Sequence, residues 1–177
     1  MNLALHTGMA RKLRIRFKDT APQNAITDGS HPCPFVELQH SLRSHIASIS
    51  PAVDLVMNFV AKFRKSDGSE VNIEVALHEA LTNSVVHGNH EDPDKLVCIT
   101  CRCSIDGEVS ITVRDQGQGF DWRAIPDPTT QDNRLSTHGR GIYLMRALID
   151  EVSFEEGGIV MNMRKESNTG LPRNRSE

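Results

Sequence analysis

Residues 71–88, which read VNIEVALHEALTNSVVHG, constrain the fold most, because they carry the apolar spacing of an amphipathic helix. The apolar side chains that would share one helix face are Ile73, Leu77, Ala80, Leu81 and Val85. Gly88 stands where such a helix would end, because glycine tolerates the left-handed conformation that terminates the backbone ladder. The stretch therefore predicts one long helix with its apolar face in the core.

Two polar residues, Glu79 and Asn83, interrupt this helix four positions apart, so they project from the same side one turn from each other. A carboxylate and a carboxamide in this arrangement offer a proton acceptor and a neutral oxygen ligand for a hard cation. A partly exposed helix face with two ordinary polar residues would look the same. The choice between the two interpretations depends on motifs further along the chain.

Length and charge suit a single soluble domain of ordinary size. The net charge of −3 over 177 residues gives no indication of a nucleic acid or an anionic membrane as partner. The charge is uneven, because five of the 20 basic residues and none of the 23 acidic ones fall in residues 1–18. That segment is therefore +5 and the remainder −8, and we expect it to be a solvated extension.

No stretch approaches the roughly 20 apolar residues of a membrane span, and residues 1–10 lack the apolar region of a secretion signal. The four cysteines do not form a disulfide framework, because three of them fall within residues 98–103. We therefore expect a protein of the reducing cytoplasm.

The chain divides into a basic, flexible extension over residues 1–34, a globular domain over 35–165 and a polar, disordered tail over 166–177. A short strand over 13–18 is compatible with the alternation there. The elements expected in the domain are a strand (35–45), two helices (51–64 and 71–88), two strands (96–104 and 109–114), a helix (142–149) and two strands (152–155 and 159–164). This order predicts an α/β (α+β) two-layer sandwich, with helices on one face of a mixed sheet.

The sequence Arg114-Asp115-Gln116-Gly117-Gln118-Gly119-Phe120 ends the second strand of the predicted 96–114 hairpin. Neither Gly117 nor Gly119 has a Cβ, so the backbone can approach a flat ligand closely. A buried carboxylate at Asp115 would accept a hydrogen bond from the exocyclic amine of adenine, whereas guanine presents an oxygen there. A hydrogen bond to a charged group contributes about 1.5–3 kcal/mol, which is enough to select a base.

A second glycine motif, Gly139-Arg140-Gly141, opens the helix that follows a polar, proline-containing segment over residues 121–138. Free N–H groups and the helix dipole make such a start a phosphate-binding geometry, and Arg140 could pair with phosphate oxygens. A glycine-rich hinge with an exposed arginine is the alternative. Because segments of this length inside a compact domain are commonly functional, we expect residues 121–138 to form a lid.

Zinc sites are weakly supported. The pair His78-Glu79 would need a histidine at position 82 to match the zinc-protease motif, and Thr82 stands there. On a strand, the first of the three clustered cysteines would face away from the other two, so buried thiols are expected instead.

Taken together, the motifs around Glu79, Asn83, Asp115 and Gly139-Arg140-Gly141 resemble the GHKL (histidine-kinase-like) ATPase superfamily in order and separation. The wording HEALTNSVVHGN, RDQGQGF and GRGIYLMRALIDEV is most similar to bacterial anti-sigma factor serine/threonine protein kinases. The resemblance covers about residues 35–165. It implies a Bergerat-type ATP-binding fold with mostly antiparallel strands.

The resemblance also implies roles for individual residues. Glu79 corresponds to the general base, Asn83 to the Mg²⁺ ligand and Asp115 to the adenine reader. The remaining ATP-binding positions are Gly117, Gly119, Gly139, Arg140 and Gly141. One departure is Gly158-Ile159, where the family commonly has Gly-Thr with its hydroxyl near the phosphates.

The function implied is an ATP- and Mg²⁺-dependent serine/threonine kinase that phosphorylates a small antagonist protein and sequesters a sigma factor, with a homodimer favoured. Two alternatives stay open. One is a non-catalytic, ATP-gated protein-binding module. The other is a detached histidine-kinase ATPase domain, which is disfavoured because no histidine-bearing hairpin precedes Phe35 and Glu79 stands where those enzymes usually carry Asn.

Overall fold

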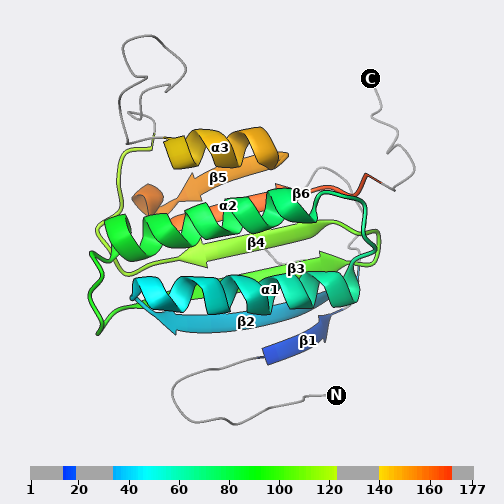
Figure 1. Ribbon diagram of the computed structural model, residues 1–177, viewed down its shortest axis with the longest axis horizontal. Coiled ribbons are helices and arrows are strands. Elements are labelled where there is room, and N and C mark those ends of the chain that lie inside the picture. Colours follow the sequence, from blue (N-terminus) through cyan, green and yellow to red (C-terminus); the bar gives the residue numbers. More distant parts are fainter. Residues whose placement is uncertain (1–13, 19–33, 123–139, 169–177) are drawn as a thin grey trace.

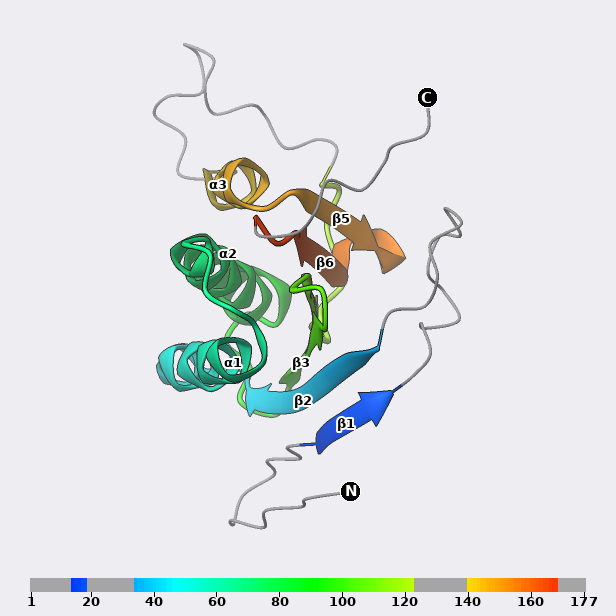
Figure 2. The same cartoon turned by 90° about the vertical axis from the view of Figure 1, so that its right-hand side faces the viewer.

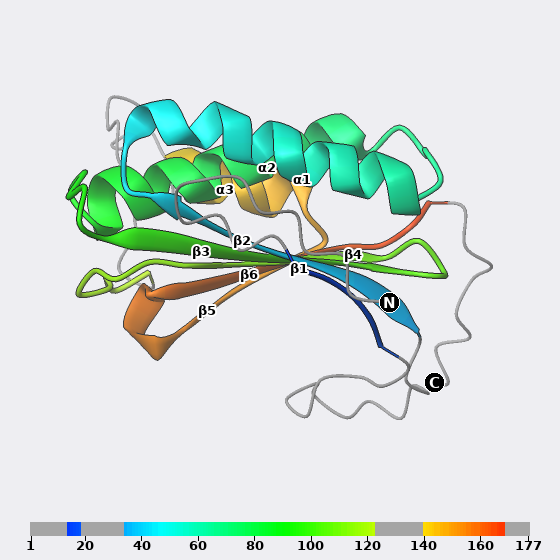
Figure 3. The ribbon, with the colours of Figure 1, turned by 90° about the horizontal axis from the view of Figure 1, so that it is seen from below.

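The computed structural model describes residues 34–122 and 140–168, together with the backbone of residues 14–18. These residues form two layers, a twisted sheet and a layer of helices that covers one of its faces (Figures 1 and 3). The predicted lid (121–138) lies almost entirely outside the described residues, as do Gly139, most of the extension and residues 169–177.

The sheet has six described strands in the order β1-β2-β3-β4-β6-β5, and every neighbouring pair is antiparallel. The strands are β1 (Arg14–Lys18), β2 (Phe35–Arg43), β3 (Leu96–Ser104), β4 (Val109–Arg114), β5 (Glu151–Glu155) and β6 (Val160–Lys165). The predicted two-layer sandwich is confirmed, although among these strands the sheet is wholly antiparallel rather than mixed. β1 pairs with β2, so part of the predicted extension belongs to the sheet.

In the described part of the chain, three α-helices form the second layer (Figure 2). They are α1 (Ile49–Phe63), α2 (Glu70–Thr82) and α3 (Arg140–Leu148), and α2 runs directly into a π-helical segment, η2 (Asn83–Gly88). Two short 3₁₀ turns, η1 (Ile46–Ser48) and η4 (Glu156–Gly158), precede α1 and β6. α2 lies between the other two helices and contacts both of them.

The core lies between the layers. In β3 and β4 every second side chain is buried, as in a half-covered antiparallel sheet. α1 contributes Ala52, Val53, Val56, Phe59 and Val60. By length and composition alone, residues 46–63 are long and apolar enough to cross a membrane, contrary to the expectation from the sequence. In the structure this segment packs its apolar stripe into the core of the domain.

The end of the domain where α1 gives way to α2 is held by the buried guanidinium of Arg64. Its Nε donates to the carbonyl oxygen of Gly107 in the β3–β4 turn, and its Nη1 donates to Ser69 Oγ, both at 2.8 Å. Its Nη2 donates to Asp67 Oδ2 at 2.8 Å and to the carbonyl oxygen of Glu166 at 2.9 Å. We call this set the Arg64 junction, because one side chain joins three segments of the chain.

Asp67 completes the Arg64 junction. Its Oδ1 accepts from the Ser69 N–H at 3.0 Å and from the Ser69 hydroxyl at 2.7 Å, and its Oδ2 also accepts from the Asn168 N–H at 2.8 Å. Burial acts to raise the pKa of this carboxyl, but the hydrogen bonds and the charge of Arg64 outweigh it and lower the pKa. Residues 166–168, which the sequence assigns to the tail, are thus hydrogen-bonded to the domain.

Candidate nucleotide site

α2 brings Glu79 and Asn83 together one turn apart, as predicted, and both are partly buried. They face the first turn of α3. A Cβ atom on Gly141 would lie 2.6 Å from Glu79 Oε2 and 3.6 Å from Asn83 Nδ2, so the α3 backbone rests against both side chains. Arg140 begins α3 and is exposed. These residues form one end of the candidate site.

The continuation of α2 is not regular, which the sequence did not predict. Asn83–Gly88 is π-helical, and the Asn89 N–H donates to the carbonyl oxygen of Ser84, five residues earlier, at 2.8 Å. Segments of π-helix are rare and frequently lie at functional sites. Here the wider turn follows directly after Asn83 and leads to the buried residues Ser84 and Asn89, which approach the end of β4.

Asp115 follows β4 and is 7% exposed. Its Oδ1 accepts from the Gly117 N–H at 2.8 Å, and the hydroxyl of Ser84 also donates to the carboxylate. Burial nevertheless raises the pKa of Asp115, because desolvation disfavours the charged form more than these hydrogen bonds stabilise it. Ser84 belongs to this end of the site, and no motif in the sequence pointed to it.

Gly88 has a different role from the predicted one. It is not among the described residues with a left-handed backbone. Instead, a Cβ on Gly88 would lie 2.6 Å from both Cγ and Oδ2 of Asp115, and one on Gly117 would collide with the carbonyl oxygen of Gly88. The backbone of Gly88 at the end of η2 therefore contacts the backbone of Gly117 in the turn after β4. The Asp115 carboxylate packs directly against the Cα atom of Gly88.

Gly119 is also required by packing within the chain. Its φ is +74°, and a Cβ there would collide with the carbonyl oxygen of Gly157, which accepts from the Phe120 N–H at 2.8 Å. Whether Gly117 and Gly119 also touch a nucleotide stays a prediction. Both glycines hold the turn beside Asp115 in place.

Ile159 lies at the Asp115 end of the site. The β4–β6 register pairs Arg114 with Val160, so Asp115 comes opposite Ile159, and the Asp115 N–H donates to the Ile159 carbonyl oxygen at 3.2 Å. Ile159 therefore lies close to Asp115, whereas Glu79 and Gly141 form the other end of the candidate site. Glu79 and Gly88 are nine positions apart along the helix, which corresponds to roughly 13.5 Å at 1.5 Å per residue.

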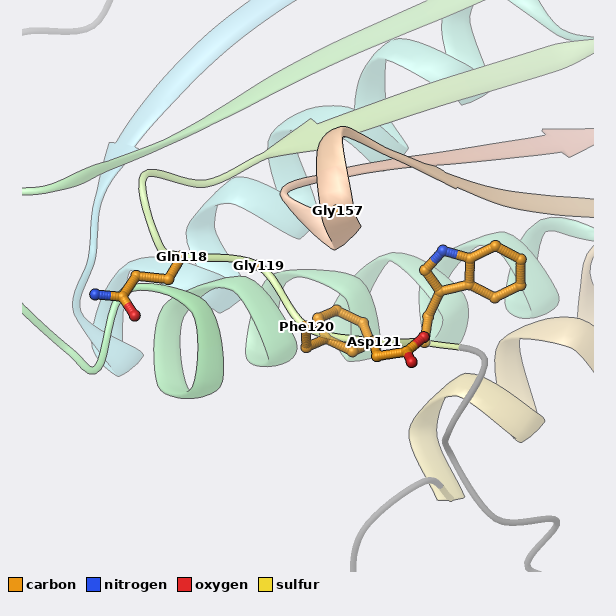
Figure 4. Close-up of a pocket in the computed structure, with 6 residues that line it drawn as sticks. Gln118, Gly119, Phe120, Asp121 and Gly157 are labelled. Atoms are coloured by element: carbon orange, nitrogen blue, oxygen red, sulfur yellow. The ribbon is translucent and has the colours of Figure 1, made fainter.

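A hollow of about 400 Å³ lies beside this loop, lined by Gln118, Gly119, Phe120, Asp121, Trp122 and Gly157 (Figure 4). The Trp122 ring stacks on Phe154 with centroids 5.4 Å apart, and the Arg146 guanidinium lies 5.7 Å from the Trp122 centroid. The cluster attaches the end of this loop to β5 and α3. The lining includes neither Glu79 nor Asp115, so the hollow is separate from the site that these residues form.

The residues at the Glu79 end fit a hard cation. Among the described residues, Asn83 Nδ2 is buried without a hydrogen-bond partner, and a half-turn of the carboxamide would place its oxygen there instead. Such a polar atom is costly unless a ligand satisfies it. Within residues 34–122 and 140–168 no three His, Cys, Asp or Glu side chains converge, so a cation here would need phosphate oxygens as further ligands.

The domain that carries this candidate site is similar to known proteins. Residues 42–165 match the model of the histidine kinase-like ATPase domain. The chain belongs to this family. The match spans α1, α2 and α3, the whole of β3, β4, β5 and β6, and the last two residues of β2.

Two relatives from this family are anti-sigma F factors. That of Heyndrickxia coagulans is 31% identical over 135 residues, which cover 73% of this chain and 90% of the relative. That of Geobacillus stearothermophilus is 34% identical over 122 residues, or 68% and 82% of the two chains. The serine-protein kinase RsbW of Staphylococcus epidermidis is 30% identical over 125 residues, or 65% and 79%. ATP is the cofactor that this family implies.

Proposed function

We propose that this chain is an ATP-dependent serine/threonine protein kinase that phosphorylates a serine on a small antagonist protein and also sequesters a sigma factor. The observation that carries the proposal is that two groups of polar residues lie at different places along α2 and η2 and contact different parts of the domain. Glu79 and Asn83 lie against the first turn of α3, and Ser84 and Gly88 lie against the buried Asp115. The anti-sigma F factors and the serine-protein kinase among its relatives support this reading.

At the Asp115 end, the carboxylate reads the base. Its oxygens accept from Gly117 and Ser84, which fixes the carboxylate for a further hydrogen bond from the exocyclic amine of adenine. Guanine would present an acceptor to the same carboxylate and leave a buried charge facing another oxygen. The site therefore selects ATP over GTP.

At the Glu79 end, the residues act on the phosphoryl group. The backbone of Gly141 in the first turn of α3, the guanidinium of Arg140 and the backbone of Gly139, which precedes the described part of this segment, bind phosphate oxygens. The Glu79 carboxylate, which has no hydrogen-bond partner among the described residues, takes the proton from the attacking serine hydroxyl. A bond forms between the serine oxygen and the γ-phosphorus, the bond to the β-phosphate oxygen breaks, and ADP leaves.

Asn83 is the residue that would hold Mg²⁺, through its carboxamide oxygen. A Mg²⁺ ion held there would supply positive charge that offsets the charge of the phosphates during transfer. Asn83 itself is oriented by its position at the start of η2, one turn after Glu79. Glu79 and Asn83, which share one helix face, thus have different roles in the proposed reaction.

The proposed setting is the bacterial cytoplasm, with the sigma factor and a small anti-anti-sigma-like protein as partners. Neither nucleic acid nor a membrane is needed as a direct partner, in keeping with the net charge of −3. We further propose a homodimer as the working assembly.

Incubation with labelled ATP, Mg²⁺ and candidate small antagonist proteins tests the proposal. We expect label on a serine of one candidate. Glu79→Gln keeps the size of the side chain and removes the base, so it should slow transfer by about 10²–10⁴-fold and leave ATP affinity nearly unchanged. Asn83→Ala should instead weaken Mg²⁺-dependent ATP binding, measured by calorimetry with and without the metal.

The two variants must fail differently, one in turnover and one in binding. If the wild type transfers no phosphoryl group to any candidate but retains a sigma factor in an ATP-dependent way, the kinase assignment is wrong and the protein is an ATP-gated binding module. Equal affinity for ATP and GTP would contradict the role of Asp115.

A further inference from the structure

Asn89 is a fully buried polar residue for which neither the motifs nor the proposed mechanism has a role. Its Oδ1 accepts from the Gln116 N–H at 2.8 Å, and its Nδ2 donates to the Leu96 carbonyl oxygen at 3.1 Å. Its own N–H closes the π-helical turn onto Ser84 at 2.8 Å. One side chain therefore connects η2, the start of β3 and the turn after β4.

The contact with Gln116 acts on Asp115, because the Gln116 N–H belongs to the peptide bond that joins the two residues. Because this peptide plane is held in place, the backbone on the C-terminal side of the Asp115 Cα atom is held in place as well. The next N–H, that of Gly117, is the one that donates to Asp115 Oδ1. The orientation of the carboxylate thus depends on a turn whose first peptide group is held by Asn89.

The other contacts make Asn89 a rigid support. The Leu96 N–H donates to Gln116 Oε1 at 2.7 Å, so Gln116 and Leu96 are joined both directly and through Asn89. Gly88, immediately before Asn89, lies against the Asp115 carboxylate. Asn89 therefore sets the position of η2 against the turn and the direction of the peptide that follows Asp115.

We propose that Asn89 is a positioning residue for base recognition, which holds the Asp115 carboxylate in the orientation that discriminates adenine from guanine. Asn89 itself does not touch the nucleotide. The inference rests on the proposed role of Asp115 in the site. It predicts that the loss of Asn89 affects the base and spares the phosphate end, where Glu79 and Gly141 contact each other without it.

The test measures dissociation constants for Mg·ATP and Mg·GTP in the wild type, in Asn89→Ala and in Asn89→Ser. Alanine removes both side-chain hydrogen bonds, and the shorter serine cannot span from Gln116 to Leu96. We expect the preference for ATP over GTP to fall by about tenfold in either variant, mainly through weaker ATP binding. A purely structural defect would weaken both nucleotides in proportion and leave the ratio unchanged.

Ser44→Ala is the matched control. Ser44 is also buried, and its hydroxyl donates to the carbonyl oxygen of Val85 in η2 at 3.4 Å, but among the described residues it makes no hydrogen bond to the turn at Asp115. It should leave the ratio at the wild-type value. Thermal melts show which variants are folded, and a folded Asn89→Ala or Asn89→Ser with a ratio within about twofold of the wild type would overturn the inference.

A measurement on the wild type covers the case in which both variants fail to fold. The Gln116 amide should exchange slowly with deuterium in the nucleotide-free protein, and fast exchange there would overturn the inference as well. If the wild type binds ATP and GTP equally, the role of Asp115 fails, and the Asn89 proposal fails with it. If the wild type selects ATP and the folded Asn89 variants do too, only the Asn89 proposal is wrong.

Discussion

The two ends of α2, a helix labelled in Figure 1, differ in whether their buried polar groups have hydrogen-bond partners. Near its N-terminus, the Arg64 junction buries a guanidinium and a carboxylate in which each of the three guanidinium nitrogens and both Asp67 oxygens have partners. Near its C-terminus, Glu79 and Asn83 have no side-chain partner among the described residues, and η2 ends against a desolvated carboxylate.

The pKa shifts of two carboxyl groups follow the same division. The pKa of Asp67 is lowered by its hydrogen bonds and by Arg64, whereas the pKa of Asp115 is raised by burial. Satisfied polar groups stabilise the folded state, and unsatisfied ones reduce stability unless a ligand binds them. The comparison indicates that one end of the helix layer maintains the fold and the other is shaped for a ligand.

The largest effect is expected at the Arg64 junction. Arg64→Met leaves Asp67 buried without its cation, so the free energy of unfolding should fall by about 3–5 kcal/mol. Urea denaturation measures this change, and ATP affinity of the folded protein should stay at the wild-type value. The exposed Lys62, in the last turn of the same helix, is the control, because Lys62→Met should change stability by less than about 0.5 kcal/mol. Equal effects of the two variants would contradict the role of the junction.

Gly88→Ala should damage the other end selectively. The new Cβ would meet the Asp115 carboxylate, so we expect ATP to bind about tenfold or more weakly, with a loss of roughly 1–3 kcal/mol in stability. Gly68→Ala supplies the comparison: Gly68 has a φ of +84° and no atom within 4 Å of the added Cβ. It should cost about 1–2 kcal/mol through backbone strain alone and leave ATP binding intact. Normal ATP binding by Gly88→Ala would contradict the proposal that this end of the helix is shaped for a ligand.

Acid should weaken the Arg64 junction. Because the folded-state pKa of Asp67 lies below its unfolded value, the stability it contributes is complete above about pH 4 and is lost as the pH falls through the folded-state value. Asp67→Asn should therefore lower stability by about 1–3 kcal/mol at pH 7 and flatten the loss below pH 4. Melting temperatures from pH 7 to pH 3 measure both. An unchanged slope in the variant would assign the acid sensitivity to other groups.

The smallest effect has the opposite sign. The folded-state pKa of Asp115 lies above its unfolded value, so its contribution to stability is present below about pH 4 and is lost as the pH rises through the folded-state value. At pH 7 the ionised carboxylate reduces stability, and Asp115→Asn should raise the melting temperature by a few degrees while weakening ATP binding. A variant that loses both stability and affinity would show that Asp115 also supports the fold.

The sequence was sufficient for elements whose determinants are local. The strands β3 and β4 begin and end at the predicted residues, because apolar alternation and Asp106-Gly107 are features of the segment itself. The pairing of Glu79 with Asn83 on one helix face follows from helical spacing in the same way. The two-layer architecture follows from the order of the elements.

Features that depend on contacts distant in the sequence were missed. The role of Gly88 is set by Asp115, 27 positions later, and no local pattern distinguishes it from a helix-ending glycine. Ser84 and Asn89 have partners in the same turn after β4, so their importance becomes visible only when η2 meets the sheet. The π-helical turn itself has no known sequence signature in this stretch. The placement of Ile159 required the β4–β6 register.

The contacts of the Trp122 ring have a consequence for the fluorescence of the protein. Trp122 is the only tryptophan in the chain, and it contacts both the Phe154 ring and the Arg146 guanidinium of α3. Its emission therefore reports on a single place, where the loop after β4 meets the helix that begins beside Glu79. Any movement of α3 against β5 changes the polarity around that indole, so the unlabelled protein carries its own fluorophore for stopped-flow experiments.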